Sequence, residues 1–82
     1  MATTRHDIAV WLQRGKDQNA THMIVVCDTF NWEDYPVYVL PGEDPREKET
    51  RYDGKDMQKI MEAYSFSLDL DMQLNEHRAS HY

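Results

Sequence analysis

Residues 21–41 read THMIVVCDTFNWEDYPVYVLP, and this stretch decides the fold because it carries the two clearest strand signals in the chain. The segment Met23–Cys27 is apolar at every position, which is typical of a central strand that is covered on both faces. The segment Pro36–Leu40 is the second expected strand. Because Pro36 has no backbone donor, it belongs at a strand start or on a sheet edge. The short connection between the two segments predicts a β-hairpin.

The hairpin loop Phe30–Tyr35 places three aromatic side chains beside two acids. Aromatic side chains with polar neighbours are typical of interface anchors, but a loop can also fold its aromatics back onto the core. Both interpretations are open for Trp32, which either contacts a partner or packs beside Trp11. We expect the partner contact in this loop. The candidate binding residues there and in the charged segment further along the chain are Asp28, Trp32, Glu33, Asp34, Tyr35, Arg46 and Arg51.

Asp28 directly follows the apolar strand, and two roles are open for its carboxylate. An aspartate at a strand end commonly accepts hydrogen bonds from the backbone of the following turn. The alternative is contact with a ligand or partner at the tip of the hairpin. The neighbouring thiol of Cys27 is not activated by this carboxylate, because a nearby negative charge raises a thiol pKa.

The N-terminal segment has the signals of a helix. Thr4 and Asp7 have the spacing of a capping-box-like start, and Ile8, Trp11 and Leu12 form one apolar stripe. Gly15, flanked by two cations, is the expected end of this helix.

The charged segment 46–51 is expected to form a short turn of helix or a loop. Beyond it, Asp53 is the expected N-cap of a second, long helix. That helix has one apolar face and a second, nearly opposite stripe made of Ala63, Phe66, Leu70 and Leu74. Because a small domain cannot cover both faces, this second stripe predicts a homo-oligomer, with those four residues at its interface.

A strand competes with this helix, because polar and apolar residues alternate strictly from Tyr64 to Leu74. Composition favours the helix, since no Val, Ile or Thr occurs from Met61 to Tyr82. The sequence therefore predicts a single α+β domain over residues 1–82, ordered helix, β-hairpin, long helix (αββα). A third strand in place of part of the last helix is the alternative.

Charge and composition limit the classes of function. Fifteen acids against nine bases give a net charge of −6, which argues against binding of a nucleic-acid backbone. No acidic or histidine spacing matches a common metal site, so we expect no metal and no cofactor. The longest purely apolar run is Met23–Cys27, too short to span a membrane, and the single cysteine fits a reducing compartment. We expect a cytoplasmic protein.

The stretch HMIVVCDTFNWEDYPVYVLPGED, with DGKDMQ following, resembles small proteins of unassigned function that recur in phage, prophage and bacterial genomes. The resemblance covers most of the chain but brings no catalytic or binding residue with it. It implies that the protein inhibits or sequesters a component of the host cell, such as a defence factor or its nucleotide signal.

Three hypotheses follow from the sequence. The leading one is a non-enzymatic accessory binding protein of phage type, acting on a host protein or a small nucleotide in the host cytoplasm. The second is an acidic mimic of nucleic acid that inhibits a host nucleoprotein. The third is a small enzyme that uses Cys27 or Asp28, although no nucleophile–base spacing supports it.

Overall fold

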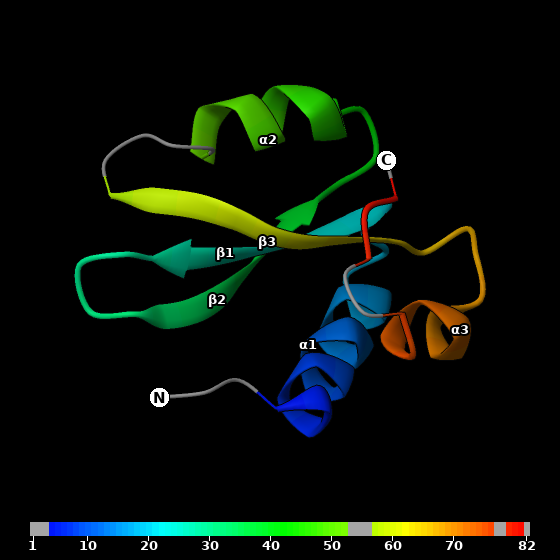
Figure 1. Ribbon diagram of the computed structural model, residues 1–82. Helices are drawn as coiled ribbons and strands as arrows, with labels where there is room; N and C mark the ends of the chain where they lie inside the picture. The colour runs from blue at the N-terminus through cyan, green and yellow to red at the C-terminus, as the bar shows by residue number, and fades with distance from the viewer. Residues whose placement is uncertain (1–3, 53–56, 77–78, 82) are drawn as a thin grey trace.

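The computed structural model describes residues 4–52, 57–76 and 79–81. Its central layer is a three-stranded antiparallel sheet in the order β2-β1-β3. Helix α2 covers one face of this sheet, while α1 and α3 cover the other (Figure 1). The elements, in chain order, are α1 (Arg5–Asp17), β1 (His22–Asp28), β2 (Glu33–Val39), α2 (Pro45–Tyr52), β3 (Gln58–Ser65) and α3 (Leu70–Leu74). The α+β class is confirmed.

The apolar segment Met23–Cys27 lies in the central strand and is buried throughout, as its sequence predicts. Alternate residues of β1 enter two separate cores. Met23 and Val25 join α1 and β3 in a core beneath the sheet, whose buried members are Ile8, Leu12, Met23, Val25, Tyr64 and Ala79. Ile24 and Val26 face α2 in a core whose buried members are Ile24, Val26, Val37, Val39 and Ala63. A strand between two cores has no polar face.

Helix α1 begins at the predicted capping box. The Thr4 hydroxyl accepts from the Asp7 amide at 3.1 Å, and the Asp7 carboxylate accepts from the Thr4 amide at the same distance. The predicted end at Gly15 is wrong, because α1 continues to Asp17 and the chain turns at Asn19, whose φ is 59°. Gly15 instead serves close packing: a Cβ there would lie 2.4 Å from Cζ of Phe66.

The predicted long second helix is wrong. Residues 58–65 form β3, which pairs with the second edge of β1 from Asp28↔Gln58 to His22↔Ser65. A buried strand must satisfy its backbone groups on both edges, and this requirement outweighs the helix-favouring composition of the segment. The alternative of a third strand is partly right, because a third strand does form. It lies earlier in the chain than expected: only Tyr64 and Ser65 of the alternating run are in β3, and residues 70–74 are helical. The expected cap Asp53 lies outside the described residues.

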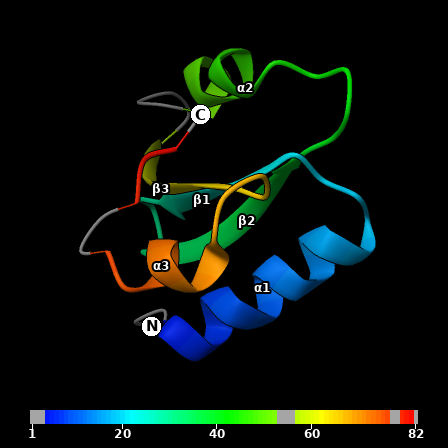
Figure 2. The same cartoon turned by 90° about the vertical axis from the view of Figure 1, so that its right-hand side faces the viewer.

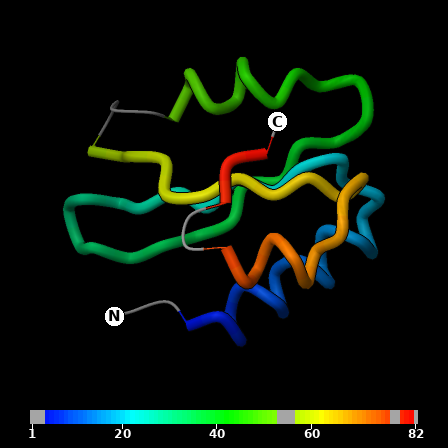
Figure 3. Tube along the Cα trace, turned by 45° about the vertical axis from the view of Figure 1, so that its right-hand side comes forward, coloured from blue at the N-terminus to red at the C-terminus, as the bar shows by residue number. Residues whose placement is uncertain are grey.

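Ala63 cannot take the interface position that the helical pattern implied. Its side chain is 1% exposed and belongs to the core under α2. On the outer edge of β3, residues 79–81 run alongside it (Figure 3), with Ala63 N donating to Ala79 O at 2.9 Å and His81 N donating to Ala63 O at 3.1 Å. Ala63 is therefore surrounded by this chain's own residues.

Candidate functional site

The tip of the β1–β2 hairpin is a short, hydrogen-bonded turn. The Asp28 carboxylate accepts from the Phe30 amide at 2.9 Å, and the Asp28 carbonyl accepts from the Trp32 amide at 2.7 Å. The Asn31 side chain accepts from the Glu33 amide at 3.1 Å. These bonds confirm the structural interpretation of Asp28. The turn is shorter than the loop Phe30–Tyr35 expected from sequence, because Glu33, Asp34 and Tyr35 already belong to β2.

Two aromatic side chains project from this turn into solvent. Phe30 is 76% exposed and Trp32 is 61% exposed. Trp32 does not pack beside Trp11, which is itself half-buried against the core beneath the sheet. The ammonium of Lys59 lies over the Trp32 ring, 5.9 Å from the ring centroid, in a cation–π contact. Of the two alternatives from sequence, the structure adopts the exposed one.

The start of β3 adds an apolar residue to this end of the molecule. Met57 is 56% exposed, and its carbonyl accepts from the Thr29 amide at 2.6 Å and from the Thr29 hydroxyl at 2.8 Å. The sequence alone does not place Met57 at the surface of the tip, because only the pairing of β3 with β1 brings it beside the hairpin. We call Phe30, Trp32 and Met57 the hairpin tip (left in Figure 1).

Two residues of the hairpin tip hold an unfavourable backbone conformation. Trp32 has a φ of 59° and Met57 a φ of 61°. In this left-handed region a residue other than glycine costs of order 1–3 kcal/mol, and the cost is smaller for Asn and Asp. Neither side chain recovers that cost by burial, since both are largely exposed. The turn thus presents large apolar groups where glycine would be more stable.

The polar candidates near the hairpin tip differ in accessibility. Glu33 is exposed and Asp34 is half-buried beside Cys27. Tyr35 lies on the face of the sheet that α2 covers, and its hydroxyl accepts from the Gln58 side-chain amide at 2.5 Å. Burial raises the pKa of Tyr35. Tyr35 therefore supports the hairpin from within, while Glu33 lies at the surface.

Cys27 is buried, and its strand neighbours are Asp34 on β2 and Lys59 on β3. Burial, followed by the Asp34 carboxylate, raises the pKa of the Cys27 thiol. His22 lies at the other end of β1, where its ring contacts the Thr21 hydroxyl at 3.0 Å. The Lys59 ammonium lowers the thiol pKa, but burial and Asp34 outweigh it, so these neighbours disfavour the nucleophilic thiolate.

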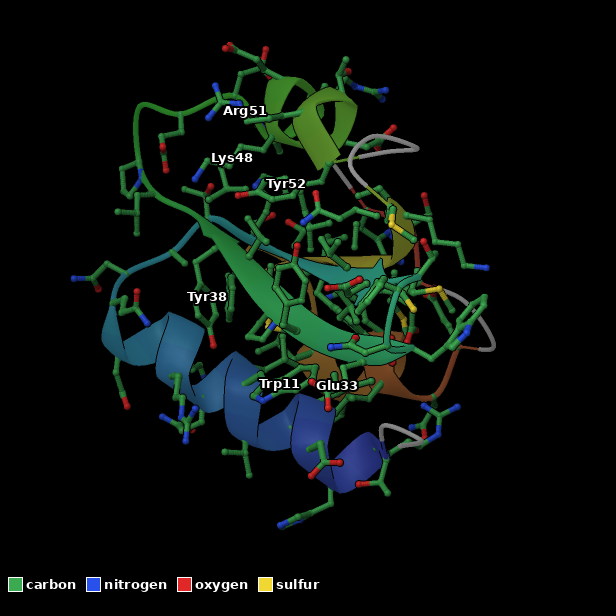
Figure 4. All side chains as sticks on the ribbon, turned by 90° about the vertical axis from the view of Figure 1, so that its left-hand side faces the viewer. Trp11, Glu33, Tyr38, Lys48, Arg51 and Tyr52 are labelled. Atoms are coloured by element: carbon green, nitrogen blue, oxygen red, sulfur yellow. The ribbon has the colours of Figure 1, made fainter. Side chains whose placement is uncertain are left out.

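The structure does not bring Arg46 and Arg51 to the hairpin tip. Both lie on α2, and Arg51 lines a hollow of about 190 Å³ beyond the far end of β2. There Arg51 pairs with Glu47 at 3.6 Å and Lys48 pairs with Glu43 at 3.2 Å. Figure 4 shows Arg51 and Lys48 beside α2 and Glu33 well below them, nearer to α1.

The sequence also contains two pairs of adjacent acids, Glu33–Asp34 and Glu43–Asp44, and the structure keeps them apart. Glu33 and Asp34 are at the start of β2, and Glu43 and Asp44 follow its end. Within residues 4–52, 57–76 and 79–81, no three His, Cys, Asp or Glu side chains are grouped so that they could hold a metal ion. In the same residues, no helix has the length and apolarity needed to cross a membrane.

Comparison with protein-family models found no match, and comparisons with curated proteins and with solved structures found none either.

Proposed function

We propose that this chain is a non-enzymatic binding protein that docks on a protein partner through the hairpin tip. The observation that carries the proposal is the exposed pair Phe30 and Trp32 on a turn held by its own hydrogen bonds. Large aromatic side chains with a polar rim are the commonest energetic centres of protein interfaces. A turn that is already ordered loses little conformational entropy when it binds.

The polar rim of the hairpin tip comes from Glu33 and Lys59, which carry opposite charges. Following the resemblance to small phage proteins, the partner would be a protein of the bacterial host and the effect would be its inhibition or sequestration. Capture of a nucleotide signal has less support, because Lys48 and Arg51 of α2 already pair with the acids Glu43 and Glu47.

The experiment compares the intact protein with Trp32→Ala and Trp32→Gly. Each would be used to capture proteins and small molecules from host lysate, and the captured partner would then be purified and its affinity measured by calorimetry. We expect both variants to lose about 2 kcal/mol or more of binding free energy. The free energy of unfolding of Trp32→Gly should exceed that of Trp32→Ala by about 1 kcal/mol, because glycine adopts the left-handed backbone conformation without strain.

Leu40→Ala is the matched control, because Leu40 is also a large exposed apolar residue but lies beyond the other end of β2. It should bind the purified partner like the intact protein. Equal binding by Trp32→Ala and the intact protein would refute the hairpin tip as the contact. Retention of a small molecule alone, unaffected by Trp32→Ala, would favour the nucleotide form of the hypothesis.

A further inference from the structure

A groove of about 430 Å³ opens between α1 and α3, on the face of the sheet opposite to α2. Figure 2 shows the two helices side by side beneath the sheet. Three of the four residues that the sequence assigned to an oligomer interface lie here. Its apolar lining includes Leu12 on α1 and Phe66, Leu68, Leu70 and Leu74 on the side of α3.

Both walls of the groove are anchored to the rest of the fold. The buried Gln73 side chain ties α3 to the end of β3, accepting from Ser65 N at 2.8 Å and donating to Ser65 O at 2.9 Å. Phe66 is held against Gly15 of α1. Helix α3 has only five residues, so it cannot extend over α1 to cover the groove. The groove is therefore a preformed feature of the surface.

The two walls carry opposite charges that do not neutralise each other. Lys16 is on the α1 wall and Asp71 is on the α3 wall. Among the described residues no ion pair joins Lys16 to Asp71 or to Asp69, and the Asp69 carboxylate caps α3 by accepting from Met72 N at 3.2 Å. A two-fold axis parallel to the groove places the cationic wall of one copy opposite the anionic wall of another, so the surface is complementary to itself.

We propose that a second copy of this chain occupies the groove in a two-fold symmetric dimer. Leu68, at the rim and 46% exposed, enters the groove of the other copy. Lys16 of each copy pairs with Asp71 of the other, and Met72, 53% exposed on α3, extends the apolar contact beyond the groove.

The groove is separate from the surface that we propose binds a partner. The loop 66–69 beside the groove and the hairpin tip lie at opposite ends of the sheet (Figures 1 and 3). A dimer built through the groove thus keeps both hairpin tips accessible. It would present two copies of the partner contact, which raises avidity for a partner that is itself oligomeric.

A charge-swap experiment tests the dimer, with sedimentation velocity over the micromolar range as the measurement. The intact protein should sediment as a dimer. Lys16→Glu and Asp71→Lys, each alone, should weaken dimerisation roughly tenfold or more, because each turns both attractive pairs into repulsive ones. An equimolar mixture of the two variants should form dimers again, since both pairs are then attractive across the interface.

Arg14→Glu is the control, because it makes the same charge change on α1 outside the groove and should leave dimerisation unchanged. Leu68→Ser should also yield a monomer, and circular dichroism establishes that each variant is folded. A monomeric intact protein would overturn the proposal, as would a mixture that stays monomeric. A trimer or an open-ended series of larger species would overturn the two-fold arrangement, because head-to-tail contacts build rings and filaments.

Discussion

Gly15 illustrates how a single residue can be misread from sequence. Its position between Arg14 and Lys16 indicates a helix end, but it lies inside α1 with the rings of Phe66 and Tyr38 against it. A Cβ at this position would come within 2.4 Å of Phe66 and 3.0 Å of Tyr38. The Tyr38 ring is held in place by its hydroxyl, which donates to the Trp11 carbonyl at 2.8 Å (Figure 4).

We predict that Gly15→Ala destabilises the protein by about 1–2 kcal/mol in urea unfolding. Alanine gains about 1 kcal/mol in helix propensity, but the steric conflict with two packed rings costs more. Adding Phe66→Leu to Gly15→Ala should recover part of the loss, because the shorter side chain leaves room for the methyl group. A Gly15→Ala protein as stable as the original would show that the rings give way.

At the scale of elements, α3 depends on one buried amide. Gln73 is fully buried and bonds Ser65 N, Ser65 O and Asp69 O. Its side chain thus pairs with both backbone groups of the last residue of β3. This explains how a helix of five residues, too short to be stable alone, keeps its place.

We predict that Gln73→Leu costs about 1–3 kcal/mol of stability, because it leaves the buried Ser65 N–H without its partner and leaves the Ser65 carbonyl only its bond from the Leu68 amide. Chemical denaturation would measure the loss, and faster amide exchange at residues 70–75 would place it at α3. The exposed Gln18→Leu should cost about 0.5 kcal/mol or less and serves as control. Equal stability of the two variants would show that α3 is held by its apolar contacts instead.

At the scale of the whole molecule, groups with shifted pKa values set the pH range of stability. Burial lowers the pKa of His22 below its ordinary 6.5, so the unfolded chain binds that proton first on acidification. Hydrogen bonds from the backbone lower the pKa of Asp7 and of Glu43 below their ordinary values of 3.8 and 4.5. These two groups stabilise the fold above those pH values, and the stabilisation is lost as the pH falls below them. Burial raises the pKa of Tyr38 and of Tyr64 above 10.0, so the unfolded chain loses those protons first.

We therefore predict that the free energy of unfolding is greatest near neutral pH and falls on both sides. The fall should begin below pH 6.5 and continue more steeply below 4.5. It should begin again above pH 9.0, the ordinary pKa of the Cys27 thiol, and become steeper above 10.0. Urea unfolding at a series of pH values would test this. His22→Gln should remove the decrease between pH 6.5 and 5 while keeping the one below 4.5. A decrease unchanged in His22→Gln would assign it to another group.

Part of this fold and site follows from short sequence patterns. The unbroken apolar run Met23–Cys27 specifies a central strand because it has no polar face for solvent. The capping box of Thr4 and Asp7 depends on residues three positions apart, and Pro36 marks an edge strand because it cannot donate. For Trp32 the sequence leaves two alternatives open, an exposed ring and a ring packed beside Trp11, because neighbours in sequence do not show what packs against the ring.

The remaining features were decided only by the tertiary structure. Residues 58–65 have helix-favouring composition but form a strand, because the buried β1 leaves an edge that must be paired. That same pairing brings Met57 to the hairpin tip and buries Ala63. The groove between α1 and α3 likewise exists only once Phe66 packs on Gly15 and Gln73 bonds Ser65. Local patterns report what a residue can do, whereas these outcomes depend on partners brought close only by folding.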